Sequence, residues 1–356
     1  MKNRIQELVK ELPQGVDSVL ITSPCNRYYF TGMHSTAGTI LVTREKSYFI
    51  IDFRYIELAK RTVTSCEVIL QDDLSKQLAE LMERHGVKTA AVETSYLSLG
   101  EYSRFVKALP SVEILSGGEV DKAILRLRSA KDSGELACIK AAQKITEEGF
   151  LHILNYIRPG LTERQVAIEL EHVMLLRGAE KLSFDTICVS GVNSSLPHGV
   201  PGEKSICAGD FVTLDFGVMV EGYCSDMTRT IAVGHATDEM LQVYDTVLRA
   251  QLAAIDAVKV GARCADVDAA ARDLIYGAGY EGCFGHGTGH SVGLEIHEDP
   301  RFAPKSDAVC VPGMVMTVEP GIYLEGKFGC RIEDMVYIGE DKVEDLTHSP
   351  KELIIL

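Results

Sequence analysis

Residues 213–230 read Thr-Leu-Asp-Phe-Gly-Val-Met-Val-Glu-Gly-Tyr-Cys-Ser-Asp-Met-Thr-Arg-Thr, and this stretch predicts a β-hairpin. Its Glu221-Gly222 pair is typical of a tight turn between two apolar strands. Because strand side chains alternate with a period of two, such a turn places Asp226 opposite Gly217 and diagonal to Asp215 on one face. Diagonal Cβ atoms lie about 7–8 Å apart, so the two carboxylates can share a cation. A surface hairpin with both aspartates in water is the alternative.

A glycine-rich segment further along the chain, residues 286–298, holds three of its ten histidines: His286, His290 and His297. Dense glycine lets the backbone approach a ligand closely. Imidazole is a common metal ligand and also suits proton transfer near neutral pH. A lone histidine is usually structural, but this concentration predicts a functional cluster.

Two more acids stand at the ends of apolar strands. Glu319 follows the apolar run at residues 314–318, and Glu333 precedes an apolar return strand that ends near Ile338. Arg331 lies beside Glu333, so a buried Arg331–Glu333 ion pair is the structural alternative. That alternative leaves Glu319 unexplained.

These segments together offer an oxygen-rich set of metal ligands with a single imidazole. Such a set suits Mn²⁺, Fe²⁺ or Co²⁺ and tolerates Zn²⁺. Four carboxylates also balance the charge of two divalent ions, which favours a two-metal site. The predicted carboxylate ligands are Asp215, Asp226, Glu319 and Glu333, and the imidazole comes from the cluster of His286, His290 and His297.

The remaining pattern predicts two domains, as the length of 356 residues also suggests. In the first, short β-rich runs at residues 16–22, 38–43, 47–52 and 89–93 alternate with helical patterns at 53–61, 74–85 and 98–109, which indicates an α/β layer structure. Gly117-Gly118 breaks this alternation. The second domain opens with a helix at residues 132–157 and a helix with a capping box at Thr162, followed by helices at 238–258 and 266–276. We therefore predict domains at residues 1–122 and 123–356.

Composition excludes several classes of function. With 36 Lys and Arg against 51 Asp and Glu, the net charge is −15. Such a chain repels phosphate backbones and anionic lipid, so we expect no nucleic-acid or membrane partner. The start of the chain lacks the apolar stretch of a signal peptide. Ten cysteines without a C-x-x-C pair are typical of reduced thiols, and we predict a cytoplasmic protein.

At this point the motifs resemble those of the creatinase/aminopeptidase family of pita-bread metallopeptidases, within it the short Xaa-Pro aminopeptidases and Xaa-Pro dipeptidases (prolidases). The resemblance covers nearly the whole chain. It rests on residues 52–55 in the first domain and on residues 196–199, 214–217, 226–230 and 318–321 in the second. Ser291 departs from the glycine that the family usually has after its ligand histidine, and this departure removes no ligand.

The resemblance implies a creatinase-like α/β N-terminal domain followed by an α+β pita-bread catalytic domain. It also implies two divalent metal ions, Mn²⁺ or Co²⁺ in the first place and Zn²⁺ or Fe²⁺ as alternatives. Asp215 would bind one ion in bidentate fashion, Asp226 and Glu333 would bridge both, and His290 and Glu319 would complete the shell of the other.

The same resemblance implies the catalytic roles and the substrate pocket. His198 and His297 would contact substrate and stabilise the tetrahedral intermediate, and Glu319 would accept a proton from water. Arg331 would orient the ligand carboxylates or the substrate. The proline pocket would be lined by Phe184, Ile296 and His297.

The expected function is metal-dependent hydrolysis of the bond between an N-terminal residue and proline, by a hydroxide bridging the two metals. We favour a homodimeric Xaa-Pro aminopeptidase acting on short peptides with proline in second position. The alternative is a Xaa-Pro dipeptidase, which must recognise a free carboxylate, for which Arg301 or Arg331 is available. A metal-free creatinase-like hydrolase and a non-catalytic binding module are disfavoured, because all five ligand positions are filled. Methionine aminopeptidases share the metal centre but usually lack a domain in front.

Overall fold

The structure is a computed structural model that describes residues 3–356; Met1 and Lys2, the first residues of the stretch that argued against a signal peptide, lie outside the described residues. The chain divides into two compact units, of which the first ends at Arg128 and the second is Ser129–Leu356. Among the described residues, no helix is both long enough and apolar enough to cross a membrane.

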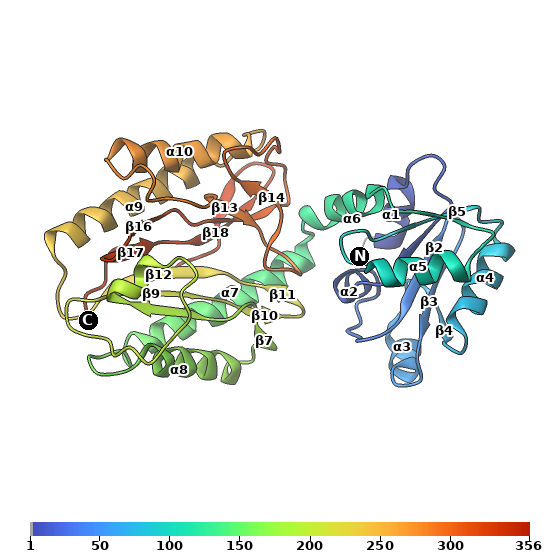
Figure 1. Cartoon of the computed structure of the whole chain (residues 1–356), viewed down its shortest axis with the longest axis horizontal. Helices are drawn as coiled ribbons and strands as arrows, with labels where there is room; N and C mark the ends of the chain where they lie inside the picture. The colour runs from blue at the N-terminus through green and yellow to red at the C-terminus, as the bar shows by residue number, and fades with distance from the viewer. Residues whose placement is uncertain (1–2) are drawn as a thin grey trace. The chain divides into compact units, whose positions relative to one another are not determined.

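The first unit is built around one six-stranded sheet in the order β4-β3-β2-β1-β5-β6 (Figure 1). Strand β2 is antiparallel to its neighbours β1 and β3, and the remaining pairs are parallel. The predicted alternation of strands and helices is confirmed, and the sequence analysis missed α2, β4, β6 and α6. The strands are β1 (Ser18–Ile21), β2 (Thr39–Thr43), β3 (Ser47–Ile51), β4 (Glu67–Leu70), β5 (Thr89–Val92) and β6 (Glu113–Leu115). The helices are α1 (Arg4–Glu11), α2 (Pro24–Thr31), α3 (Ile56–Thr62), α4 (Leu74–Arg84), α5 (Leu99–Ala108) and α6 (Glu119–Ser129).

The second unit places one pair of helices on each side of a set of antiparallel strands (Figure 1). All four helices were predicted: α7 (Ser133–Ile153), α8 (Glu163–Leu176), α9 (Asp238–Ala257) and α10 (Cys264–Gly277). Helix α8 starts with the predicted capping box, in which Thr162 and Gln165 exchange hydrogen bonds.

The strands of the second unit form small sheets in the orders β11-β10-β7, β12-β9-β8, β14-β13-β15-β18-β19 and β16-β17. The strands that pack against α7 and α8 begin with β7 (Lys181–Leu182) and β8 (Ile187–Ser190), which leads into the 3₁₀ helix η1 (Gly191–Ser195), and continue with β9 (Phe211–Phe216), β10 (Val218–Val220), β11 (Tyr223–Cys224) and β12 (Met227–Ala232). The later strands are β13 (Gly289–Ser291), β14 (Glu298–Phe302), β15 (Val315–Val318), β16 (Gly321–Leu324), β17 (Phe328–Arg331), β18 (Asp334–Ile338) and β19 (Val343–Asp345).

Two hydrophobic cores fix which face of each strand is polar. Leu214 and Phe216 of β9 pack in the core that contains α7 and α8, whereas Met316 and Val318 of β15 pack in the core that contains α9 and α10. Because side chains alternate along a strand, the intervening residues point away from the helices. The polar residues that interrupt these strands therefore face the space between the two layers, where the candidate site lies.

Candidate metal centre

The first hairpin has the predicted register and turn. Phe216 pairs with Met227 before Gly217, and Met219 pairs with Cys224 after it. Both pairs follow one register, which places Asp226 opposite Gly217. Glu221 and Gly222 have φ angles of 47° and 73°, the left-handed conformations that a type I′ turn requires. A Cβ at Gly217 would come within 1.9 Å of a backbone oxygen, so glycine is required between the two strands. Asp215 and Asp226 both line the cavity described below, and the surface-hairpin alternative is wrong.

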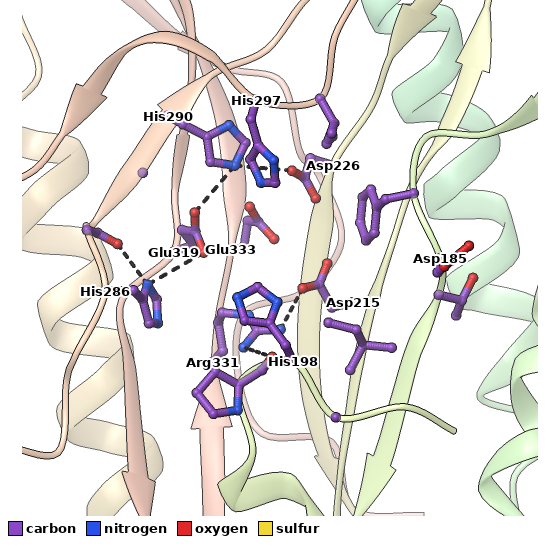
Figure 2. Close-up of a pocket in the computed structure, with 18 of the residues that line it drawn as sticks. Asp185, His198, Asp215, Asp226, His286, His290, His297, Glu319, Arg331 and Glu333 are labelled. Atoms are coloured by element: carbon purple, nitrogen blue, oxygen red, sulfur yellow. Dashed lines mark hydrogen bonds and ion pairs between the residues drawn. The ribbon is translucent and has the colours of Figure 1, made fainter. Parts of the chain in front are cut away.

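A second hairpin, β15 to β18, supplies the other two carboxylates. Val318 pairs with Asp334, so the next residues, Glu319 and Glu333, leave paired strands side by side. Both carboxylates face the same cavity as the aspartates. Two hairpins from different parts of the sequence thus converge on one site (Figure 2).

His290 on β13 presents one ring nitrogen to these carboxylates. Its Nδ1 lies 3.1 Å from the carbonyl oxygen of Ser291, which fixes the proton on that nitrogen. Its Nε2, left with a free lone pair, lies 3.6 Å from Asp226 Oδ2 and 3.5 Å from Glu319 Oε1. Burial lowers the pKa of His290 to about 3, so the ring is neutral, as a metal ligand must be.

The negatively charged carboxylates repel one another when no cation lies between them. Ligand atoms of Asp226, His290 and Glu333 all lie within 4.8 Å of each other. Burial, followed by the charge of Asp215, raises the pKa of Asp226 well above its ordinary value. Burial, followed by the charge of Asp226, does the same for the pKa of Glu333, and burial raises the pKa of Glu319 to about 7.

The donor set therefore fits divalent cations. Among the described residues, the buried Asp215 Oδ1 has no hydrogen-bond partner, which is unusual for a buried carboxylate oxygen. Its other oxygen is held by Arg331. A cluster of buried carboxylate charges without cations costs free energy. Bound divalent ions would neutralise all four carboxylates and so remove that cost.

Arg331 is hydrogen-bonded to Asp215, Tyr323 and Thr228 rather than paired with Glu333. Its guanidinium donates to Asp215 Oδ2 at 2.5 Å, to the Tyr323 hydroxyl at 2.7 Å and to Thr228 Oγ1 at 3.1 Å. Thr228 in turn donates to Glu333 Oε2 at 2.7 Å. The alternative of a direct Arg331–Glu333 ion pair is therefore wrong. The two residues are linked by hydrogen bonds through the Thr228 hydroxyl instead.

The four carboxylates, His290 and Arg331 line one cavity of about 480 Å³ in the second unit. His198 and His297 are exposed, and the His297 ring lies 4.5 Å from the His290 ring, centroid to centroid (Figure 2). Phe184 and Ile296 add apolar surface to the wall. The structure brings every predicted site residue together: Phe184, His198, Asp215, Asp226, His290, Ile296, His297, Glu319, Arg331 and Glu333.

Sequence reasoning left two neighbouring side chains without a role. His286 Nε2 shares a hydrogen bond of 2.9 Å with the Tyr323 hydroxyl. The other ring nitrogen, Nδ1, lies 3.9 Å from Glu319 Oε2. Burial lowers the pKa of His286 to about 4, so this ring is also neutral. The sequence did contain a signal for Tyr323. Side chains two residues apart on a strand point to the same face, so residues 319, 321 and 323 share one face of the second hairpin.

Comparison with known proteins gives the family. Residues 137–340 match the model of metallopeptidase family M24, and residues 3–129 match that of the creatinase/prolidase N-terminal domain. The chain is 35% identical over 357 residues to a Xaa-Pro dipeptidase of Pyrococcus furiosus, with 99% of this chain and 100% of that one covered.

Solved structures agree with the sequence comparisons. A Xaa-Pro dipeptidase from Bacillus anthracis matches with a TM-score of 0.95 and 42% identity over 99% of both chains. An X-Pro aminopeptidase from Thermotoga maritima matches with a TM-score of 0.90 and 36% identity, covering 96% of this chain and 98% of that one. The predicted fold class is thereby confirmed, and the chain belongs to metallopeptidase family M24, with a creatinase/prolidase N-terminal domain ahead of its pita-bread peptidase domain.

Proposed function

We propose that this protein is a Xaa-Pro dipeptidase that uses two divalent metal ions. The observation that carries the proposal is the convergence of four carboxylates and a neutral imidazole on one cavity. The sequence alone favoured the aminopeptidase and kept the dipeptidase as the alternative. The relatives from Pyrococcus furiosus and Bacillus anthracis, both named Xaa-Pro dipeptidases, support that alternative better.

The cavity also offers a group for the substrate carboxylate. Arg331 is buried and donates to Asp215, Tyr323 and Thr228, so it is committed to the ligands. Arg301 is exposed on the cavity wall, and its closest carboxylate in an ion pair, Asp299, lies at 3.8 Å. A guanidinium can bind a carboxylate in bidentate fashion, so Arg301 is the anchor that a dipeptidase needs.

Five side chains would hold the two ions: Asp215, Asp226, His290, Glu319 and Glu333. When bound, the ions lower the pKa of water and polarise the scissile carbonyl. The Xaa-Pro bond has no N–H, so its recognition falls to groups that contact the carbonyl oxygen and the ring. Phe184 and Ile296 provide apolar surface for the proline ring.

Three side chains would assist proton transfer and charge stabilisation in the reaction. Glu319 lines the cavity and would accept a proton from water and pass it to the leaving nitrogen. His198 and His297 lie at the exposed side of the cavity. From there they donate hydrogen bonds to the oxygen on which negative charge develops in the transition state.

We further propose Mn²⁺ or Co²⁺ as the working metal, because carboxylate oxygens dominate the ligand set. We also propose that the protein is a homodimer, which its resemblance to the family supports. We propose a cytoplasmic location, which its free cysteines support. The filled ligand set continues to disfavour a metal-free hydrolase or a non-catalytic binding module.

Metal removal tests the proposed activity directly. Purified protein loaded with Mn²⁺ is expected to hydrolyse Ala-Pro, and dialysis against EDTA is expected to abolish this hydrolysis until Mn²⁺ is restored. Elemental analysis confirms that the metal has left. Substantial turnover by protein shown to be metal-free would refute the metal-dependent mechanism.

Arg301 provides the test of dipeptidase against aminopeptidase action. Replacing Arg301 by methionine is expected to raise the KM for Ala-Pro at least about tenfold, because one charge-assisted hydrogen-bonded pair is lost. The KM for Ala-Pro-Ala, whose carboxylate lies one residue further away, is expected to change less. Lys305→Met is a matched control outside the cavity lining. Equal effects on both substrates would contradict the role in carboxylate binding.

Metal affinity is expected to rise with pH. In the metal-free protein burial raises the pKa of Glu319 to about 7 and raises the pKa values of Asp226 and Glu333 well above their ordinary range, so metal binding must displace protons from these groups. Each displaced proton strengthens binding up to about tenfold per pH unit until the group ionises. Calorimetric titration with Mn²⁺ at pH 6, 7 and 8 measures this, and a pH-independent affinity would contradict it.

A further inference from the structure

One buried carboxylate in the second unit lies outside the predicted ligand set. Glu163, the first residue of helix α8, is 0% exposed. Its Oε1 accepts the backbone N–H of Ser190 at 2.7 Å and the Ser190 hydroxyl at 2.9 Å. Its Oε2 accepts the backbone N–H of Gly202 at 3.2 Å, and Asn193 Nδ2 donates to both oxygens at 3.1 and 3.2 Å. Hydrogen bonds to an ionised acceptor are about twice as strong as neutral ones, so this carboxylate binds its donors firmly.

The donors to Glu163 are the two ends of one segment, residues 190–202, which we call the His198 segment. Ser190 is the last residue of β8, and Asn193 lies in the 3₁₀ helix η1 that follows. Gly202 lies at the far end, and between the two ends His198 lines the cavity (Figure 2). A single carboxylate therefore holds the segment at its start through one oxygen and at its end through the other.

The hydrogen bonds at the start of the segment have a fixed direction. Lys204 Nζ donates to Ser190 Oγ at 2.8 Å and also forms an ion pair with Asp210 at 2.7 Å. An ammonium group has donors only, so the Ser190 hydroxyl accepts from Lys204 and directs its own proton to Glu163. Each contact of the Glu163 carboxylate thus requires an acceptor, and none of its partners can exchange roles with it.

The middle of the His198 segment is attached to the metal centre instead. The carbonyl oxygen of Pro197, directly before His198, accepts from Arg331 Nη1 at 3.3 Å. The same guanidinium holds the predicted ligand Asp215. The segment is therefore fixed to the site near His198 and fixed to helix α8 at its two ends. Release of either end lets the backbone around His198 shift relative to the ligands.

We propose that Glu163 is a positioning residue that holds the His198 segment at both ends and so sets the place of the His198 ring in the cavity. The proposal rests on the proposed function, in which His198 donates to the oxygen that becomes negative in the transition state. Misplacement of such a group by about 1 Å can cost about 100-fold in rate. Glu163 therefore acts on the reaction through His198.

Glu163→Gln is the variant that tests this role. Whichever way the amide turns, its NH₂ group faces a backbone N–H, of Ser190 or of Gly202, so one end of the segment is released. In Mn²⁺-loaded protein, kcat for Ala-Pro is expected to fall at least about tenfold, with KM changed less than about threefold and metal content unchanged. Glu169→Gln makes the same change on the same helix, where Glu169 pairs with the part-exposed His152, and is expected to leave kcat unchanged.

A double-mutant cycle with His198→Ala separates positioning from general support of the fold. In the His198→Ala background, Glu163→Gln is expected to change kcat less than about threefold, because the group that it positions is gone. An equal loss in both backgrounds would overturn the inference, as would an unchanged kcat in Glu163→Gln alone.

Asn193→Ala keeps the inference testable if Glu163→Gln fails to fold. This variant removes the donor that the two carboxylate oxygens share and leaves their bonds to Ser190 and Gly202. It is expected to lower kcat at least about threefold, and this loss is expected to disappear in the His198→Ala background. A loss that persists there would contradict the role of Glu163.

A readout independent of activity separates this inference from the proposed function. Hydrogen exchange measured by mass spectrometry is expected to be faster at residues 191–200 in Glu163→Gln and to keep wild-type rates there in Glu169→Gln. If wild-type protein fails to cleave Ala-Pro, the proposed function is wrong, while the exchange rates still test whether Glu163 holds the segment. Wild-type exchange at residues 191–200 in Glu163→Gln would overturn the inference.

Discussion

Asp226→Asn is expected to abolish Ala-Pro hydrolysis while the fold remains intact. We expect kcat to fall at least about 1,000-fold, equivalent to roughly 4 kcal/mol of lost transition-state stabilisation. The reason is geometric, because Asp226 lies beside both His290 Nε2 and the Glu333 carboxylate in the proposed metal site. An amide keeps the shape of the side chain but loses one anionic oxygen, so we also expect at least one metal ion to be lost per chain.

The fold is expected to tolerate this change because of the electrostatics of the metal-free site. Burial and Asp215 raise the pKa of Asp226 well above its ordinary value, so the charged form is the unfavourable one there. A neutral asparagine removes that repulsion, and the unfolding midpoint of the metal-free variant is expected to be no lower than that of wild type. Circular dichroism during urea unfolding measures this midpoint.

The matched control for this variant is Asp185→Asn. Asp185 also lines the cavity, yet its side chain is exposed and points away from the ligands (Figure 2). We expect its metal content to equal that of wild type and kcat to change by less than about threefold, or roughly 0.6 kcal/mol. An Asp226→Asn protein with wild-type turnover, or one that keeps both metals, would refute the ligand assignment.

The sequence predicted the site well wherever local periodicity decides the geometry. Asp215 and Asp226 share a face because a two-residue turn sets the register of their hairpin, and both facts are local. Glu319 and Glu333 follow in the same way from the second hairpin. The helices of the second unit were equally predictable, since amphipathic periodicity and end signals mark them.

What the sequence could not predict depends on how the two hairpins meet. Arg331 has Glu333 as its close neighbour in the chain, but its guanidinium crosses to Asp215, 116 residues away. No periodicity reports such a contact, because it is set by the packing of two separate layers. The same holds for the contact of His286 with Tyr323 and for Glu163, whose partners lie between 27 and 39 residues further on.

In the first unit, short elements were missed for a different reason. Helix α2 begins with Ser23 as its cap and Pro24 in its first turn, both of which are helix-start signals. Its eight residues are too few to establish an amphipathic period. Strand β6 has only three residues and one buried side chain, so tertiary pairing with β5 rather than its own sequence makes it a strand.

A second large effect is expected from Arg229→Met, this time on stability. Arg229 and Asp334 form an ion pair at 2.8 Å, with side chains that are 1% and 0% exposed. The guanidinium also donates to the backbone carbonyls of Glu333 at 2.7 Å, Ser349 at 2.8 Å and Pro350 at 2.9 Å. It therefore joins strand β12 of the first hairpin to the start of β18 and to the C-terminal segment.

Methionine fills much of the same volume but satisfies none of these acceptors. Asp334 keeps Lys351 as a second cation, but three buried carbonyl oxygens lose their charged donor at once, and we expect the free energy of unfolding to fall by about 3–5 kcal/mol. Urea unfolding followed by circular dichroism measures it in protein prepared with excess Mn²⁺ and without metal. The control is Arg249→Met, which removes an exposed pair with Asp245 at 3.7 Å and is expected to cost less than about 1 kcal/mol.

Arg229→Met is also expected to weaken metal binding, although Arg229 is not among the predicted ligands. The Glu333 carbonyl that Arg229 holds belongs to a predicted ligand, and the next residue, Asp334, is its ion-pair partner. Freed from these contacts, the end of the second hairpin can shift relative to Asp226 on the first, and a metal site tolerates little displacement of the carboxylates that would hold the ions. A variant that loses stability while its Mn²⁺ affinity stays at the wild-type value would show that the two hairpins are held in register without Arg229.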